Sequence, residues 1–156
     1  MSSAGFRFEE TMRGSWYMLS KPEEERAIEF SIEARVDNLR RFARDLNARI
    51  RGVVTLEGLC KHANLDGTLG MKLLRENRLP YDFSFTADDG KKYRIRGEKN
   101  VVALGLLESL TTLPASLYDA EENEIGRAVV RFDLRSDWRK FLFSFRPRLS
   151  LGGASG

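Results

Sequence analysis

The chain has 156 residues, of which 42% are hydrophobic and 31% charged, and its net charge is +3. This size and composition predict one globular domain, residues 1–156, with an ordered core over 6–149 and a flexible tail over 150–156. No apolar run is long enough to span a bilayer, and the mild positive charge is spread along the chain, which is not typical of nucleic-acid-binding proteins. The single cysteine, Cys60, and a start without a signal-peptide segment predict a cytoplasmic protein.

The first third of the chain alternates apolar and polar residues, which is typical of strands with one buried face. Phe8, Met12 and Trp16 share such a face. The period changes to helical spacing after Asp37 or Asn38, either of which is a suitable helix cap. The elements predicted here are strands at 6–18, 28–36 and 50–57, a charged loop at 21–26 and a helix at 38–46.

The longest alternation runs from Leu79 to Lys99. Two apolar faces of the same period flank Asp88-Asp89-Gly90, and Asp-Gly between such runs is a strong hairpin signal. The elements predicted around it are a loop at 58–67, a strand at 69–73 and hairpin strands at 79–86 and 93–99.

The last third gives a mixed pattern and then a clear one. We predict a strand near 106–117, a turn at 119–124 and a strand at 128–134. Ser136 or Asp137 is then expected to cap a second helix, 137–145, with Trp138 and Phe141 on its apolar face.

Eight short antiparallel strands in series predict a mainly β protein. Eight is also the number at which a closed barrel is just filled by side chains, or just holds one small ligand. We therefore expect a single antiparallel, lipocalin-like β-barrel with two short helices, and a β-sandwich is the alternative.

Aromatic residues recur on the faces that are expected to point inward. They could line a ligand cavity, and they could equally form an ordinary packed core. The candidate ligand-binding aromatics are Trp16, Phe30, Tyr81, Phe83, Tyr93 and Phe132.

Three charged residues share the parity of these apolar faces: Glu10, Lys99 and Glu108. A charge inside a barrel is costly unless it is paired and hydrogen-bonded. Each of the three therefore pairs, binds a polar ligand group, or lies at the rim in water. If Glu10 and Lys99 are both inside, each is the other's most economical partner.

Nothing in the sequence predicts a catalytic constellation, a metal site or a cofactor. His62 is the only histidine and lies in a predicted loop, and no cysteine pair accompanies it. Gly52, Gly58, Gly67 and Gly70 do not have phosphate-loop spacing and are interpreted as bends of the barrel.

Three segments carry a resemblance. In order they are Phe8-Glu-Glu-Thr-Met12-Arg-Gly14, Tyr81-Asp-Phe-Ser-Phe85 continuing through Asp89-Gly90 to Gly97-Glu-Lys99, and Thr111-Thr-Leu113. Together they resemble a bacterial β-domain found beside or fused to oxidoreductases of the glucose–methanol–choline, cholesterol-oxidase-like type. The resemblance implies an accessory β-domain near lipid or sterol chemistry and supplies no catalytic residues.

The hypothesis drawn from the sequence is a non-catalytic barrel that binds a hydrophobic small molecule of the lipid or sterol class. The resemblance adds an oxidoreductase as the partner to which the barrel is an accessory. The first alternative is an interaction module that docks on a partner enzyme through residues 138–149. The second is a small barrel isomerase or cyclase in which Glu10 or Glu108 is a base with a raised pKa.

Overall fold

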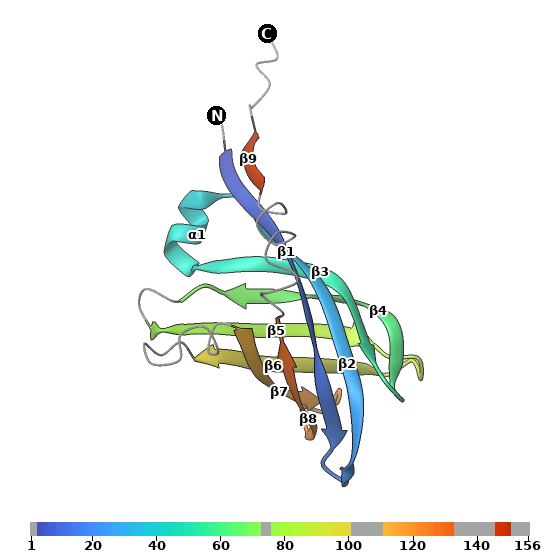
Figure 1. The fold of residues 1–156 in the computed structure, drawn as a ribbon. Coiled ribbons are helices and arrows are strands. Elements are labelled where there is room, and N and C mark those ends of the chain that lie inside the picture. Colours follow the sequence, from blue (N-terminus) through green and yellow to red (C-terminus); the bar gives the residue numbers. More distant parts are fainter. Residues whose placement is uncertain (1–2, 73–75, 101–110, 133–145, 151–156) are drawn as a thin grey trace.

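The computed structural model describes residues 3–72, 76–100, 111–132 and 146–150 of the chain (Figure 1). It is mainly β. The elements are β1 (Ser3–Met18), β2 (Lys21–Val36), α1 (Leu39–Asp45), β3 (Asn47–Leu56), β4 (Cys60–Gly70), β5 (Arg78–Thr86), β6 (Lys92–Asn100), β7 (Thr112–Tyr118), β8 (Glu124–Arg131) and β9 (Arg146–Ser150).

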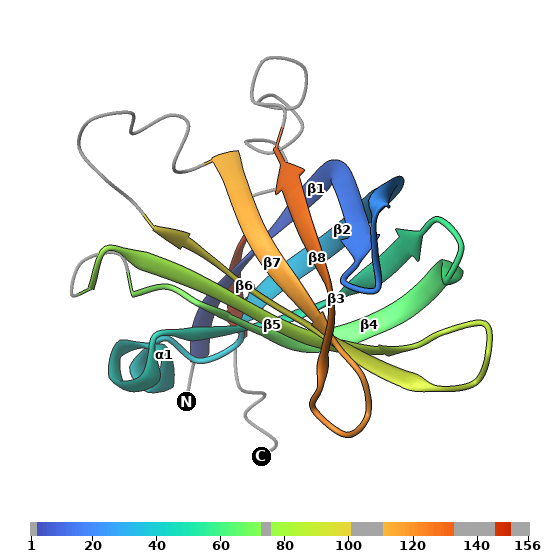
Figure 2. The same cartoon turned by 90° about the horizontal axis from the view of Figure 1, so that it is seen from below.

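The first eight strands form a closed antiparallel barrel. Each of them pairs with the next along the chain, and β8 returns to pair with β1, so that β1 has β2 on one side and β8 on the other. In Figure 1, β3–β6 run across the view while β1 and β2 run steeply over them; Figure 2 shows β7 and β8 completing the wall. This confirms the predicted barrel over the sandwich alternative.

The ninth strand lies outside the barrel proper. β9 pairs antiparallel with Ser3–Arg7, at the start of β1, whereas β8 pairs with Arg13–Met18 further along the same strand. β1 therefore pairs with β9 near its start and with β8 near its end. Residue 150, which was expected in the flexible tail, belongs to β9.

The barrel interior holds the alternating apolar residues. Strand β2 shows this best, because its second half alternates buried and less buried positions up to Val36. The largest side chains that are almost fully buried are Trp16, Phe30, Phe83, Met12, Ile50, Leu56, Ile95, Leu113, Val54 and Val130. They come from strands all around the wall, so one continuous core fills the middle of the barrel.

Two glycines allow neighbouring strands to approach closely where the wall bends. A Cβ atom added to Gly14 would overlap the carbonyl oxygen of Val129, and one added to Gly52 would overlap that of Ser31. Only glycine lets two backbones come this near. This agrees with the interpretation of Gly52 as a bend of the barrel.

Two of the predicted loops are strands. Residues 21–26 begin β2, and this part of β2 has no buried side chain on either face. Most of 58–67 belongs to β4, where His62 has a φ of 52° beside a register shift between Val54 and Leu56. Because of this irregularity, the buried side chains change from an even position, Cys60, to an odd one, Leu65. The segment therefore lacks the strict alternation by which the other strands were predicted.

The first predicted helix is confirmed as α1, with Asn38 as its cap: the Asn38 side chain accepts hydrogen bonds from the backbone N–H groups of Arg40 and Arg41. Phe42 packs edge-on against Phe6 at 5.4 Å between ring centroids, whereas Leu39 is exposed.

The second predicted helix, 137–145, lies outside the described residues. Within the described part of the chain, the seven-residue α1 is far too short to cross a membrane, and no other helix there is long and apolar enough to do so.

Candidate functional site

The candidate site lies toward one end of the barrel, which we term the α1 end. Here β2, β4 and β6 finish, and α1 and the start of β1 are close by (Figure 2). Lys99 is the second-last residue of β6, and Tyr81 is the fourth residue of β5. Glu10 lies in the part of β1 between the stretch that pairs with β9 and the stretch that pairs with β8.

Glu10, Tyr81 and Lys99 form a buried polar cluster inside the barrel. The Lys99 Nζ atom donates a hydrogen bond to Glu10 Oε1 at 2.8 Å. The Tyr81 hydroxyl donates to Glu10 Oε2 at 3.0 Å and lies 3.3 Å from Oε1. Lys99 Nζ also lies 5.1 Å from the centroid of the Tyr81 ring, a cation–π distance.

Burial makes this cluster unlike the other ion pairs described. The side chains of Lys99 and Glu10 are 4% and 7% exposed, whereas both partners of Arg13–Glu29 are about half exposed. The rim-exposure alternative is therefore wrong for Glu10 and Lys99, and the expectation that they pair with each other is confirmed.

The cluster keeps the Tyr81 phenol in its neutral form. Burial raises the pKa of Tyr81 well above its usual value, and the negative charge of Glu10 and the hydrogen bond to it act in the same direction. A neutral phenol can donate a hydrogen bond to Glu10, whereas a phenolate has no hydrogen to donate. Tyr81 therefore supports the carboxylate without adding a charge of its own.

The cluster has hydrogen-bonding capacity in reserve. An ammonium group has three donors and a carboxylate has about four acceptor positions. Among the described residues, Glu10 is the sole hydrogen-bond partner of Lys99 Nζ, so two of its donors are left over. A polar atom brought to this point could accept from Lys99.

Apolar side chains lie around the same end of the barrel. They are only partly buried, although each packs against the core, and we call them the collar. Leu79 is directly opposite Lys99 in the β5–β6 ladder, and Phe6 contacts Phe42 of α1. The collar consists of Phe6, Phe42, Met71, Leu79 and Phe132.

The predicted ligand-binding aromatics are distributed between core and edge. Trp16, Phe30 and Phe83 are buried, and the rings of Phe30 and Phe83 lie 5.3 Å apart. Tyr93 stacks on Phe85 at 5.9 Å between ring centroids, and its hydroxyl donates to Asp89 near the other end. Phe132, which was expected on an inward-pointing face, is partly buried, because β8 ends at Arg131, one residue before it.

One buried donor lies apart from the cluster. Trp16 Nε1 has no hydrogen-bond partner in the part of the chain that the structure describes, and the Arg26 guanidinium lies 5.8 Å from the centroid of its ring. Trp16 pairs with Ala128 and Arg26, toward the end opposite to α1. It therefore contributes nothing to the cluster.

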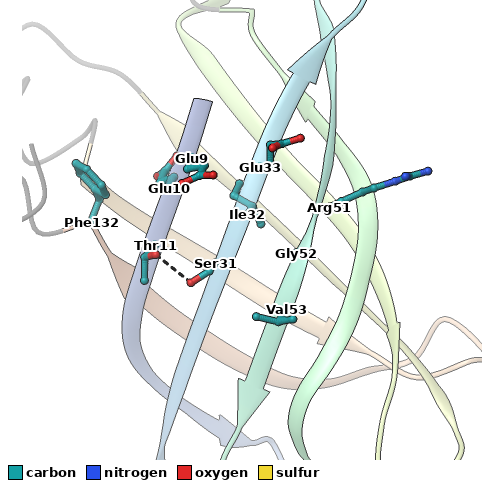
Figure 3. Close-up of a pocket in the computed structure, with 10 residues that line it drawn as sticks. All are labelled: Glu9, Glu10, Thr11, Ser31, Ile32, Glu33, Arg51, Gly52, Val53 and Phe132. Carbon is teal, nitrogen blue, oxygen red and sulfur yellow. Dashed lines mark hydrogen bonds between the residues drawn. The ribbon is translucent and has the colours of Figure 1, made fainter. Parts of the chain in front are cut away.

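A groove of about 400 Å³ crosses the outer wall over β1, β2 and β3 (Figure 3). Thr11 and Ser31 are hydrogen-bonded across its floor at 2.9 Å, and Glu33 and Arg51 flank it. Glu10 also lines it, so the groove reaches the strand position that bears the cluster carboxylate. Its lining mixes polar and charged side chains with the apolar Ile32, Val53 and Phe132.

The remaining candidates carry no site. His62 is exposed in β4, and Cys60 is buried with its pKa raised chiefly by desolvation. Within the described residues no group of His, Cys, Asp or Glu side chains could hold a metal ion. Glu108 and most of the predicted docking segment 138–149 lie outside the described residues.

The arrangement can anchor a polar group, but it does not offer a free base. The isomerase hypothesis requires an unpaired carboxylate, and Glu10 is held by both Lys99 and Tyr81. Sequence reasoning found Glu10 and Lys99 by their parity, and it placed Tyr81 only among the aromatics. Its hydroxyl was missed because contact across a barrel interior has no local signal. No family model, curated protein or solved structure that was compared with this chain matches it.

Proposed function

We propose that this protein is a lipocalin-like barrel that binds an amphiphilic small molecule of the lipid or sterol class at the α1 end. The polar group of the ligand reaches the Glu10–Tyr81–Lys99 cluster, and its apolar body lies against the collar. The ligand binds without covalent chemistry.

One observation carries this proposal: a buried ion pair, whose lysine has donors that the described residues do not use, lies next to partly buried apolar side chains. Replacing a buried ion pair by apolar residues is often neutral or stabilising, so stability alone gives little reason to keep one. A ligand site does give a reason, because binding pockets combine an apolar lining with a few convergent polar groups. Leu79 beside Lys99 brings the two kinds of surface into direct contact.

Two wider features belong to the proposal. The resemblance of three short segments supports an accessory role beside an oxidoreductase of the glucose–methanol–choline type. The lone cysteine supports a cytoplasmic location, since an odd, buried thiol suits a reducing compartment.

The test is a screen of the full chain by native mass spectrometry and thermal shift against fatty alcohols, fatty acids, sterols and isoprenoids. We expect a one-to-one complex with at least one class and a rise in melting temperature. Glu10→Gln with Lys99→Met, which removes both charges together, should weaken that complex, and so should Leu79→Asn at the collar.

A matched control is Arg13→Ala with Glu29→Ala, which removes an exposed ion pair from β1 and β2. This control should bind like the wild type. The proposal is overturned if no class binds to the wild type, or if the cluster and collar variants bind as tightly as the control.

A further inference from the structure

The charge of the cluster restricts which polar group it can accept. Glu10 contributes one negative charge and Lys99 one positive charge, and both side chains are over nine-tenths buried. The Tyr81 phenol is neutral, since burial and the Glu10 carboxylate raise its pKa well above the usual value. The net charge of the cluster is therefore zero. A charged ligand would leave a net charge in a buried site, which is costly.

The free hydrogen-bonding positions restrict the ligand further. Of the three donors of Lys99 Nζ, the described residues use one, and Glu10 Oε2 accepts one described hydrogen bond, from Tyr81. A hydroxyl group can accept from Lys99 and donate to Glu10 at the same time. A carboxylate can only accept, and it would place its oxygens against those of Glu10.

The apolar surroundings favour a ligand with one polar group. On β1 the neighbours of Glu10 with the same parity are Phe8 and Met12, and both are buried. Tyr81 lies opposite the buried Leu69 on β4. A second polar group on the ligand would meet these side chains.

We propose that the cluster recognises the uncharged hydroxyl group of an amphiphile, in preference to the carboxylate or sulfate of a matched molecule. Long-chain alcohols and sterols share this chemistry. The inference rests on the proposed function and makes it specific. Lys99 donates a hydrogen bond to the hydroxyl oxygen of the ligand, and the hydroxyl group donates a hydrogen bond to Glu10.

The test compares matched pairs by competition against a fluorescent probe at pH 7: hexadecanol with hexadecanoic acid, and cholesterol with cholesterol sulfate. We expect the wild type to bind the uncharged member of at least one pair about tenfold more tightly, because juxtaposed like charges are strongly unfavourable. Binding by the alcohol pair or by the sterol pair identifies the source of the hydroxyl.

Glu10→Gln reverses the charge argument, because it leaves the positive charge of Lys99 alone in the site. The preference should then shift to the charged member of the pair. Glu29→Gln, at an exposed residue of β2, should leave the wild-type preference unchanged. If Glu10→Gln does not fold, Glu10→Gln with Lys99→Met restores a neutral site, and hexadecanol should bind it no better than hexadecane.

The outcomes separate the two proposals. If no member of either pair binds, this inference fails, and the proposed function fails with it when no class in the wider screen binds either. If the acid or the sulfate binds the wild type as tightly as its uncharged partner, the inference is overturned while the binding function stands. Equal binding of hexadecane and hexadecanol to the wild type also overturns it.

Discussion

The Nζ atom of Lys99 lies 2.8 Å from Oε1 of Glu10 inside the barrel, although 89 positions separate the two residues in the sequence. Removing one partner leaves the other charge buried without compensation. We expect Glu10→Gln and Lys99→Met each to lower the free energy of unfolding by about 3–5 kcal/mol. The double variant should recover much of this loss in urea denaturation. Small, additive effects would contradict the buried pair.

The exposed pair Arg13–Glu29 provides the control for that cycle. Its atoms are 2.7 Å apart, closer than those of Lys99 and Glu10, but both side chains are about half exposed. Alanine at either position should cost about 1 kcal/mol or less. Burial, and not distance, then accounts for the difference between the two pairs.

Tyr81→Phe should cost about 1.5–3 kcal/mol, the usual value of a hydrogen bond to a charged group. The hydroxyl donates to Glu10 in the interior, where water cannot replace it. Tyr93→Phe is the comparison, because its hydroxyl donates to Asp89 in a more exposed place, and it should cost less. Equal losses for the two variants would show that the interior position of Tyr81 adds nothing.

The same phenol makes stability depend on alkaline pH. Burial raises the pKa of Tyr81 in the folded state, so above about pH 10 the unfolded chain loses this proton first and unfolding becomes easier. The contribution is complete below pH 10 and declines as the pH rises further. Tyr81→Phe should therefore lose less stability than the wild type between about pH 9.5 and pH 11, measured by urea denaturation. Parallel losses would contradict the raised pKa.

Phe83→Ala tests how tightly the middle of the barrel is packed. The Phe83 ring lies 5.3 Å from that of Phe30 and is almost fully buried. Its removal should cost about 3–5 kcal/mol in a close-packed site. Val129→Ala, at an exposed residue of β8, should cost about 0.5 kcal/mol or less. A much smaller loss for Phe83→Ala, with folding retained, would reveal a cavity beside the ring.

Gly52→Ala tests the bend of the wall. The new methyl group would meet the carbonyl oxygen of Ser31, and neither backbone can move away without breaking the β2–β3 ladder. We expect a loss of about 1–3 kcal/mol in chemical denaturation. Ser84→Ala, at an exposed strand position, should be close to neutral. If Gly52→Ala were as stable as the wild type, the close approach would have no structural importance.

The barrel could be predicted because its interior requires one apolar residue in every two. This rule located β2 from Ile28 onward, and it located the β5–β6 hairpin, in which Phe83 lies opposite Ile95. The rule failed in two places where the structure does not require alternation. The irregularity at His62 changes the parity of β4, and the exposed start of β2 has no buried face that would require alternation.

The candidate site could be predicted in part. Parity placed Glu10 and Lys99 inside, and the cost of an unpaired buried charge predicted their pairing. The Tyr81 hydroxyl could not be assigned in this way, because its contact with Glu10 depends on the diameter and stagger of the closed barrel. Neither quantity is encoded within a single strand.

The pairing of β1 with β8 has a consequence for the order in which this protein can fold. β1 is made first, yet the strand that closes the barrel against it, β8, is the last of the eight. Ladders between such distant segments form slowly, because a long stretch of chain must be ordered first. The edge of β1 at Arg13–Met18 therefore stays unpaired until β8 has been made. An exposed edge is a template for pairing with other chains. Translation speed and chaperone access should matter more for the yield of this protein than for that of a helical protein of the same length.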